Sequence, residues 1–460
     1  MLERKSTLPS AQKTFAFAGG VLIALVAVRL CLLQGWVRPV RISGASMAEN
    51  LPGEHFGLRC GECAFPCRYD AEHPPADERV VCPNCGAVQR HLHGAVLNVG
   101  QRVWIDRWAG LWQRPKRWDV VALRSRSDPD YLEVKRVVGL PGEQLSIRRG
   151  DLYANGQIVR KSLDQFRRIA ILVHDNGFEP AGVRRLPARW RAPVPPWDTP
   201  LAGEPNPAAG SAIPLSAWLV YHHWRCFASP LPRTDESPVL DNYGYNQNES
   251  RQLHRVQDLL LVARLRWEGD RGSVVLRGYD GDDWYRATLE FPARQAKLYR
   301  GSQLVATAPL PAAAYARDVE LEFALYDRQV VLAVDERVVV GWRCELADEA
   351  GRPANAASEH GPLPEAALRR EQERAWAQRQ PLGIAVRGLS AVIRRLQVFR
   401  DLHYLDPRGL GRDWSAPAPL GNDEVLVLGD NVPISRDSRH GQPPGVARDR
   451  LLGPVLPAGR

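Results

Sequence analysis

The sequence has no block of basic residues interleaved with aromatics. Its net charge of +9 comes from arginines that are scattered along the chain. A nucleic-acid groove concentrates basic charge beside stacking aromatic rings, so we expect no nucleic-acid partner. The positive surplus instead favours the anionic surface of a membrane.

Long apolar runs are also scarce, because only one is present, from residue 14 to about residue 37. Its one charged residue is Arg29, and its length is about that needed to span a hydrocarbon layer of ~30 Å. No clear small-x-small site follows the run, which favours an uncleaved anchor over a cleaved signal peptide.

Basic residues on the two sides of this run set its expected orientation. Three precede it and two follow it closely. The positive-inside rule therefore predicts a cytoplasmic N-terminus (1–13), a single transmembrane span (14–37) and a body on the extracytoplasmic side of the cytoplasmic (inner) membrane. The lipid bilayer is then one expected partner.

The rest of the chain is long enough for two or three folded units, with 44% apolar residues among 460. Its 38 glycines and 37 prolines imply many turns. The predicted fold class is therefore mainly β.

A serine and a lysine are candidates for chemistry. Ser46 lies about nine residues beyond the apolar run, and a serine hydroxyl becomes a nucleophile only when a base takes its proton. Lys135 lies on a predicted strand between Val134 and Val137. Burial there would lower the pKa of its amine until the neutral form can act as a general base. The alternative is an edge-strand lysine whose ammonium stays in water.

Five segments in this order resemble the motifs of the type I signal peptidases. They are "SGASM" (43–47), "VGQRVWIDR" (99–107), "RWDVVALR" (117–124), "VKRVVGLPGE" (134–143) and "GDNVPISRDSR" (429–439). The resemblance implies a membrane-anchored serine endopeptidase with a β-rich catalytic fold. Its substrates would be the signal peptides of secreted preproteins, and it needs no cofactor for catalysis.

The same resemblance implies a role for each motif residue. Ser46 would be the nucleophile and Lys135 the general base. Ser435 would help to orient the lysine, while Asp437 and Arg439 would form a supporting salt bridge.

Other motif residues would complete the site. The backbone N–H of Ser46 would hold the oxyanion, and the second donor would come from Ser43 or from the backbone near Gly44. Met47 would line the substrate groove, and Asp430 belongs to the turn of the last motif. After Met47 the chain departs from the family pattern Ser-Met-x-Pro-Thr-Leu, with Glu49 and Asn50 in place of Pro and Thr. These two residues are expected near the groove, where they would change specificity.

Two Cys-x2-Cys pairs, Cys60 with Cys63 and Cys82 with Cys85, are separated by eighteen residues. This spacing is typical of a zinc ribbon, here an insertion at 58–92, with four thiolates around a structural Zn²⁺. Cys67 would be a spare. In an oxidising exterior, disulfides between the same cysteines are the alternative.

A long insertion separates the lysine motif from the last motif by 285 residues. The predicted peptidase domain is split into 38–160 and 406–460, with a Pro/Trp-rich region (161–258) and a β-sandwich (259–405) between its parts. Strand patterns recur about every ten residues in 259–405, and Val319, Leu321, Phe323 and Leu325 alternate with more polar residues. This region loosely resembles concanavalin-A-like jelly rolls, and its partner would be a glycan or a protein. The His222–His223 pair is expected at the surface.

Two functions fit these patterns. The first is cleavage of signal peptides by a Ser46/Lys135 dyad. The alternative is a catalytically decayed, membrane-anchored binding protein whose sandwich recognises a glycan or an extracellular polymer. The altered residues after Met47 and the glycine at position 44 motivate the alternative.

Overall fold

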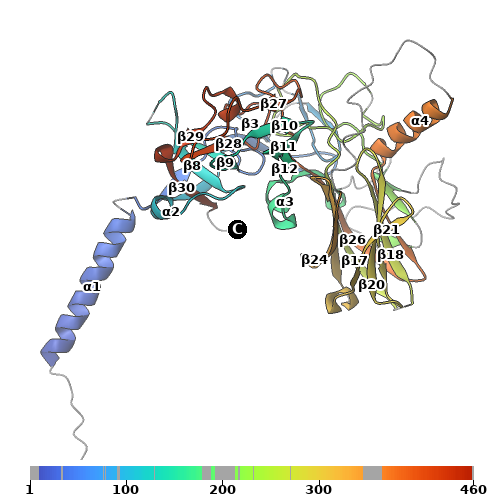
Figure 1. Cartoon of the computed structure of the whole chain (residues 1–460), viewed down its shortest axis with the longest axis horizontal. Coiled ribbons are helices and arrows are strands. Elements are labelled where there is room, and N and C mark those ends of the chain that lie inside the picture. Colours follow the sequence, from blue (N-terminus) through green and yellow to red (C-terminus); the bar gives the residue numbers. More distant parts are fainter. Residues whose placement is uncertain are drawn as a thin grey trace, which may run out of the picture.

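The computed structural model describes residues 10–32, 35–75, 77, 79–90, 94–128, 130–178, 188–191, 213–215, 218–231, 233–269, 271–316, 318–344 and 365–457. Residues 1–9 of the predicted cytoplasmic segment and residues 192–212 of the Pro/Trp-rich region lie outside this part. Figure 1 shows two β-rich bodies beside one another, with helix α1 (Ser10–Leu32) projecting from the first and helix α4 (Glu365–Arg379) beside the second. The protein is thus mainly β, as predicted.

The predicted transmembrane anchor is not supported by the structure. Helix α1 begins before and ends before the predicted span of 14–37. Over the described residues, no helix combines the length and the apolarity needed to cross a bilayer.

The first β-rich body is built on an antiparallel sheet in the order β1-β7-β30-β8-β9-β28-β29. A smaller sheet, β12-β11-β10-β27, packs beside it. Strands from the last forty residues pair with strands from before residue 140, so the chain returns to its first sheet after the long insertion. The strands of the larger sheet are β1 (Val37–Arg41), β7 (Arg102–Asp106), β8 (Val120–Arg124), β9 (Leu132–Gly139), β28 (Glu424–Leu428), β29 (Val446–Ala447) and β30 (Leu451–Pro457). The smaller sheet contains β10 (Leu145–Arg148), β11 (Asp151–Ala154), β12 (Gln157–Ile158) and β27 (Trp414–Ser415), and helix α2 (Arg107–Trp112) packs on β30 of the larger sheet. Helix α3 (Leu163–Ile169) packs Phe166 against Tyr326 of the sandwich.

The second body is a sandwich of two antiparallel sheets, in the orders β13-β26-β17-β22-β23-β24, with β15 also on β26, and β14-β16-β25-β18-β19-β20-β21. Apolar side chains from both sheets form one core between them. The alternation predicted for residues 319–325 is confirmed, because Val319, Leu321, Phe323 and Leu325 all lie in this core. The strands of the first sheet are β13 (Ile171–Asp175), β15 (Ile213–Leu215), β17 (Leu259–Glu268), β22 (Val319–Tyr326), β23 (Gln329–Val334), β24 (Arg337–Arg343) and β26 (Ser390–Arg400). Those of the second are β14 (Trp190–Arg191), β16 (Leu219–Tyr221), β18 (Ser273–Tyr279), β19 (Trp284–Glu290), β20 (Gln295–Arg300), β21 (Gln303–Pro309) and β25 (Leu382–Arg387).

The cysteine-rich insertion forms two small sheets of its own. One contains β2 (His55–Arg59), β3 (Pro66–Asp70) and β6 (Val96–Asn98), and the other contains β4 (Arg79–Val81) and β5 (Val88–Arg90). The insertion packs on the sandwich side, since the Trp224 indole donates to the Cys85 carbonyl at 3.2 Å. Asn84 binds Asp175 of β13 through the Asp175 N–H at 2.8 Å and the Asp175 carbonyl at 3.2 Å. The two insertions therefore contact one another.

The surface prediction for His222 and His223 is wrong. Both imidazoles are buried, with exposed fractions of 0% and 5%. His222 lies 2.7 Å from a Glu236 oxygen, and His223 lies 2.9 Å from the Tyr221 hydroxyl. These polar partners inside the sandwich allow two adjacent histidines to be buried.

A buried charge cluster joins the first body to the sandwich. Lys161 donates from its Nζ to Asp327 at 2.6 Å and lies 2.8 Å from Asp401. Asp151 and Asp258 add two more carboxylates, and an oxygen of each lies within 4.8 Å of the Asp327 carboxylate. The Lys161 ammonium thus pairs directly with two carboxylates, and two more lie beside them. Burial, reinforced by the charge of Asp327, raises the pKa of Asp151 to about 7.

Replacing Asp151 with asparagine is expected to stabilise the protein, and more at pH 8 than at pH 5. A carboxyl whose folded-state pKa is raised is penalised once it ionises, so wild type loses stability as the pH rises from about 4 to 7, and the variant escapes that loss. The gain at pH 8 should be on the order of 1 to 3 kcal/mol. Urea unfolding at both pH values measures it, with the exposed Asp164→Asn variant as control. An equal effect of Asp151→Asn at both pH values would contradict the assignment.

Candidate active site

Ser46 lies on the loop that connects β1 to β2. The carbonyls of Ala45 and Ser46 accept hydrogen bonds from Asn431, the first from its side-chain Nδ2 at 3.1 Å and the second from its backbone N–H at 3.0 Å. The backbone of the nucleophile loop is therefore tied to the loop 429–439, whereas the Ser46 side chain is only partly buried. This leaves the hydroxyl accessible from a cavity.

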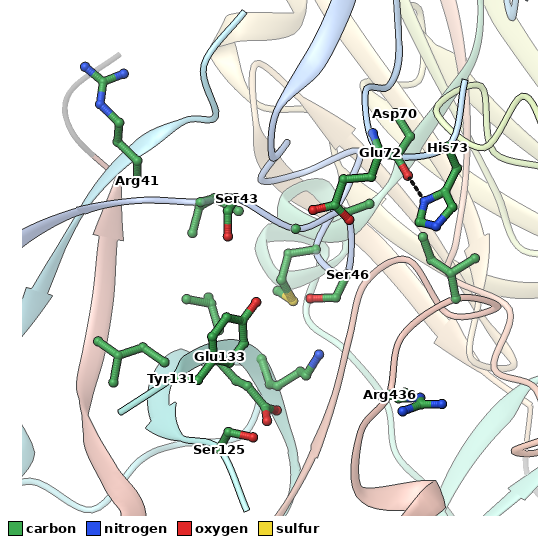
Figure 2. A pocket seen from close by; sticks show the side chains of 18 of the residues that line it. Arg41, Ser43, Ser46, Asp70, Glu72, His73, Ser125, Tyr131, Glu133 and Arg436 are labelled. Carbon is green, nitrogen blue, oxygen red and sulfur yellow. Dashed lines mark hydrogen bonds and ion pairs between the residues drawn. The ribbon is translucent and has the colours of Figure 1, made fainter. Parts of the chain in front are cut away.

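That cavity has a volume of about 710 Å³ and lies where the predicted site residues converge. Ser43, Gly44, Ser46, Met47 and Lys135 all line it. In Figure 2, Ser43 and Ser46 lie on one stretch of chain, with Tyr131, Glu133 and Ser125 across the cavity from them. Apolar side chains of Val40, Ile42, Ile105, Leu132 and Val134 cover part of the wall.

Lys135 extends from β9 and is only 4% exposed. Its Nζ donates to the Ser435 hydroxyl at 3.1 Å. Burial lowers the pKa of Lys135, although the nearby charge of Asp437 opposes the effect. Among the hydrogen bonds of the described residues, Lys135 pairs with Ser435 and has none to Ser46. The structure thus gives the lysine its predicted orienting partner and places the serine on the same cavity.

The loop 429–439 is held by a buried ion pair. The Arg439 guanidinium donates to both carboxylate oxygens of Asp437 at 2.8 Å, and Asp437 also accepts the N–H of Gly429 at 3.1 Å. Burial alone would raise the pKa of Asp437, but the charge and hydrogen bonds of Arg439 hold it below its usual value. At Gly429 a β-carbon would lie 2.2 Å from the Ser435 hydroxyl oxygen, so only glycine fits beside the partner of Lys135.

Replacing Arg439 with methionine is expected to lower the free energy of unfolding by about 3 to 5 kcal/mol, because it leaves the Asp437 carboxylate buried without its cation. Urea denaturation of the full chain measures the change. The control is Arg408→Met, which removes an exposed guanidinium 3.8 Å from Asp406 and should change stability by less than about 1 kcal/mol. Equal effects of the two substitutions would contradict the role given to the buried pair.

Asp430 also makes a buried ion pair, with the residue after the lysine. Its carboxylate accepts two hydrogen bonds from Arg136, at 2.7 and 2.5 Å. Asn50 donates to the same carboxylate at 3.0 Å. Asp430 therefore fixes β9 and the nucleophile loop to the turn of the last motif.

Glu49 and Asn50 do not line the cavity, so the expectation that they lie at the substrate groove is wrong. The partly buried Glu49 carboxylate accepts the backbone N–H groups of Gly244, at 2.7 Å, and Tyr245, at 3.3 Å. Burial raises the pKa of Glu49. Glu49 thus contacts the segment that contains Gly244 and Tyr245, and Asn50 contacts Asp430.

Two inserted segments supply cavity residues that no sequence motif indicated. The cysteine-rich insertion contributes Asp70, Glu72 and His73, and the segment before β17 contributes Asn246, Asn248 and Glu249. Asp70 holds His73 at 2.8 Å and raises the pKa of that imidazole. In Figure 2, Glu72 and His73 lie on the side of Ser46 away from Arg41. Only the folded arrangement brings these side chains together.

The four predicted metal ligands gather at one buried point. The Sγ atoms of Cys60 and Cys85 are 3.7 Å apart, as are those of Cys63 and Cys82, and all four lie within 4.8 Å of one another. Cys67 is not part of this group. All five cysteines of the insertion carry free thiols and form no disulfide bond. The group could hold one metal ion.

Both cysteine turns have the same backbone geometry. The N–H of Ala64 donates to the Cys60 carbonyl, and the N–H of Gly86 donates to the Cys82 carbonyl, each at 2.8 Å. Ala64 and Gly86 both adopt positive φ angles, of 59° and 75°. Both Cys-x2-Cys segments therefore end in tight turns.

Comparison with known proteins supports part of this account. Residues 87–180 match the model of a family described as signal peptidase, peptidase S26. The matched stretch includes Lys135 and its strand but neither Ser46 nor the loop 429–439. No curated protein matches the chain.

Several solved structures similar to the chain match about a third of it. They include the carbohydrate-binding module CBM66 from Bacillus subtilis, with 12% identity over 32% of this chain and 73% of that chain and a TM-score of 0.18. The galectin LEC-6 from Caenorhabditis elegans has 11% identity, coverage of 31% and 81%, and a TM-score of 0.19. Sheep galectin-11 has 12% identity, coverage of 36% and 98%, and a TM-score of 0.19.

Proposed function

We propose that this chain is a membrane-anchored serine endopeptidase of the signal peptidase I type, which removes signal peptides from exported preproteins outside the cytoplasmic membrane. The observation that carries the proposal is the position of Lys135. Its amine is buried and bonded to Ser435, and it shares a cavity with the accessible hydroxyl of Ser46. The match of residues 87–180 to a signal peptidase family supports the same class of reaction.

In the proposed reaction, the Ser46 hydroxyl attacks the carbonyl carbon of the scissile peptide bond. The neutral amine of Lys135 takes the hydroxyl proton and then passes it to the departing amino group. Water, deprotonated by the same amine, hydrolyses the acyl-enzyme and releases Ser46. The Ser46 N–H and the Ser43 hydroxyl, both at the cavity, are candidates for holding the oxyanion.

The substrate would be an extended segment with small or apolar side chains before the cut. The apolar wall formed by Ile42, Ile105, Leu132 and Val134 suits such side chains. An anchor over residues 14–37 would hold the cavity at the surface where such a segment leaves the bilayer, which raises its effective concentration.

A structural zinc ion belongs to the same proposal. Cys60, Cys63, Cys82 and Cys85 would hold it, since tetrahedral Zn–S bonds of ~2.3 Å separate sulfur atoms by about 3.8 Å. The observed sulfur separations of 3.7 Å fit that geometry. Four protein ligands leave no open position, so the ion would stabilise the insertion and take no part in catalysis.

Cleavage of a preprotein by the detergent-solubilised full chain tests the proposal. We expect wild type to release a peptide that ends in a small residue, and Ser46→Ala to lower the rate by at least about 10³-fold. Absence of cleavage by wild type, with a glycan bound equally well by wild type and by Ser46→Ala, would instead establish the decayed binding protein as the function.

A further inference from the structure

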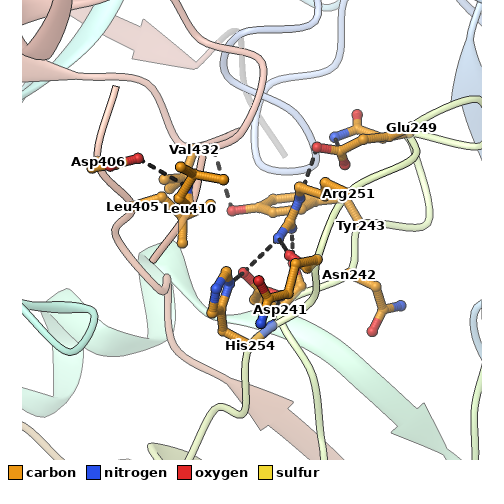
Figure 3. A network of polar contacts seen from close by, with 12 residues as sticks. Asp241, Asn242, Tyr243, Glu249, Arg251, His254, Leu405, Asp406, Leu410 and Val432 are labelled. Carbon is orange, nitrogen blue, oxygen red and sulfur yellow. Dashed lines mark hydrogen bonds and ion pairs between the residues drawn. The ribbon is translucent and has the colours of Figure 1, made fainter. Parts of the chain in front are cut away.

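An inserted segment supports the candidate active site from behind. This bridging segment, residues 241–251, precedes the sandwich strand β17 and lies against the loop 429–439 (Figure 3). It is folded on itself, because Arg251 pairs with Asp241 and with Glu249, each at 2.8 Å. The Arg400 guanidinium on β26 donates to the Asn242 carbonyl at 2.7 Å, which fixes the segment to the sandwich.

The bridging segment binds the loop 429–439 at two points. The Tyr243 hydroxyl donates to the Asp430 carbonyl at 2.8 Å and lies 3.4 Å from the Val432 N–H (Figure 3). Asn246 and Asn431 exchange two hydrogen bonds through their side-chain amides, at 2.7 and 2.8 Å. A reciprocal amide pair fixes which way both amide groups point.

Asn431 contacts both halves of the Ser/Lys pair, one through its side chain and one through its backbone. Its side-chain Nδ2, which also donates to Asn246, donates to the Ala45 carbonyl beside the nucleophile. Its own carbonyl accepts the N–H of Ser435, the partner of Lys135, at 3.0 Å. Loss of Asn246 would free the Asn431 amide to rotate away from the nucleophile loop.

The nucleophile loop binds the bridging segment directly as well. The Glu49 carboxylate accepts the N–H groups of Gly244 and Tyr245. A β-carbon on Gly244 would lie 2.8 Å from Pro83 of the second cysteine turn, so the segment is also packed against the cysteine-rich insertion. Glu49, which replaces a family-pattern residue, thus holds the nucleophile loop to the bridging segment.

We propose that Asn246 is a positioning residue that the insertion supplies to the Ser46/Lys135 pair and that acts through Asn431. This inference rests on the proposed peptidase function. The bridging segment is accordingly part of the catalytic apparatus, and the peptidase depends on its insertion for turnover.

The test is a double-mutant cycle on the full chain. Asn246→Ala should lower kcat for preprotein cleavage roughly 10- to 100-fold with KM nearly unchanged, because a small misplacement of reacting groups slows chemistry more than binding. Asn431→Ala should lower kcat at least as much, and the double variant should be no slower than Asn431→Ala alone. Asn246→Asp, which keeps the size but loses the donated hydrogen bond, is the second variant should Asn246→Ala fold poorly. The control is Asn422→Ala, which changes an exposed asparagine in the turn before β28 and should leave kcat within about twofold of wild type.

Additive losses in the double variant, or an unchanged kcat in both Asn246 variants, would overturn the inference. Amide hydrogen exchange tests the positioning role of Asn246 separately from the proposed peptidase function, because this measurement needs no substrate. The Asn431 and Ser435 amides should exchange faster in Asn246→Ala than in wild type. If wild type fails to cleave, the proposed peptidase function is wrong. Unchanged exchange at these amides in Asn246→Ala would then also refute the positioning role of Asn246. Faster exchange would support that role.

Discussion

Replacing Lys135 with alanine is expected to lower the rate of preprotein cleavage by at least about 10³-fold, because Ser46 then has no base to take its proton. Lys135→Arg should be equally inactive. A guanidinium keeps the charge and much of the length of the side chain but stays protonated at any working pH. Initial rates of cleavage by the full chain measure both effects.

The pH dependence of wild type follows from the same amine. Burial lowers the pKa of Lys135, so the neutral base becomes abundant below the ordinary lysine range, and the rate should rise with pH until that pKa is passed. Lys297→Ala is a control, since this lysine lies on the sandwich and pairs with Glu290 at 2.6 Å. Cleavage by Lys135→Ala at the wild-type rate would show that Lys135 is not the general base for Ser46.

The second large effect is expected when zinc is lost. Purified protein should contain one zinc ion per chain, and Cys82→Ser should release it and lower the melting temperature by on the order of 10 °C or more. Binding to four thiolates contributes folding free energy of about 10 kcal/mol in small zinc domains, and a domain of this size loses a few degrees per kcal/mol. Elemental analysis and calorimetry measure the two quantities.

Cys67→Ser is the matched control for the zinc prediction. Cys67 is buried in the same insertion, but its Sγ contacts the Phe65 carbonyl and is not one of the four gathered sulfurs. Its substitution should leave the zinc content unchanged. Protein that contains no zinc after purification in metal-replete medium, or Cys82→Ser protein that keeps a full equivalent, would rule the site out.

Zinc loss should also affect the candidate active site. Asp70 and His73 belong to the cysteine-rich insertion, and the backbone N–H of Asp70 donates to the Tyr245 carbonyl at 3.0 Å. The insertion therefore contacts the bridging segment that supports the loop 429–439.

Local patterns in the sequence predicted local structure well. The alternation at 319–325 gave β22 because a strand repeats its environment every second residue. Asp335 and Glu336 connect β23 to β24, and both adopt the positive φ angles of a tight hairpin. The paired Cys-x2-Cys spacing predicted the gathered thiols, since each spacing fixes one turn.

Long-range contacts could not be read in the same way. Asp70 and Asn246 lie beside Ser46 only because two insertions fold back over the first body, and neither residue has a local signal. Glu49 was predicted to lie near the substrate groove because it closely follows Met47 in the sequence. Its carboxylate instead accepts the N–H groups of Gly244 and Tyr245. The burial of His222 depended on Glu236, a partner that no spacing rule indicated.

The central claim is that Lys135 activates Ser46, and acylation tests it most directly. The full chain is treated with a serine-directed penem, and the peptides are examined by mass spectrometry. We predict one adduct, on the peptide containing Ser46, formed by wild type and absent from Lys135→Ala. Wild-type protein that carries no adduct on Ser46, or a Lys135→Ala variant that acylates at the wild-type rate, would contradict the account.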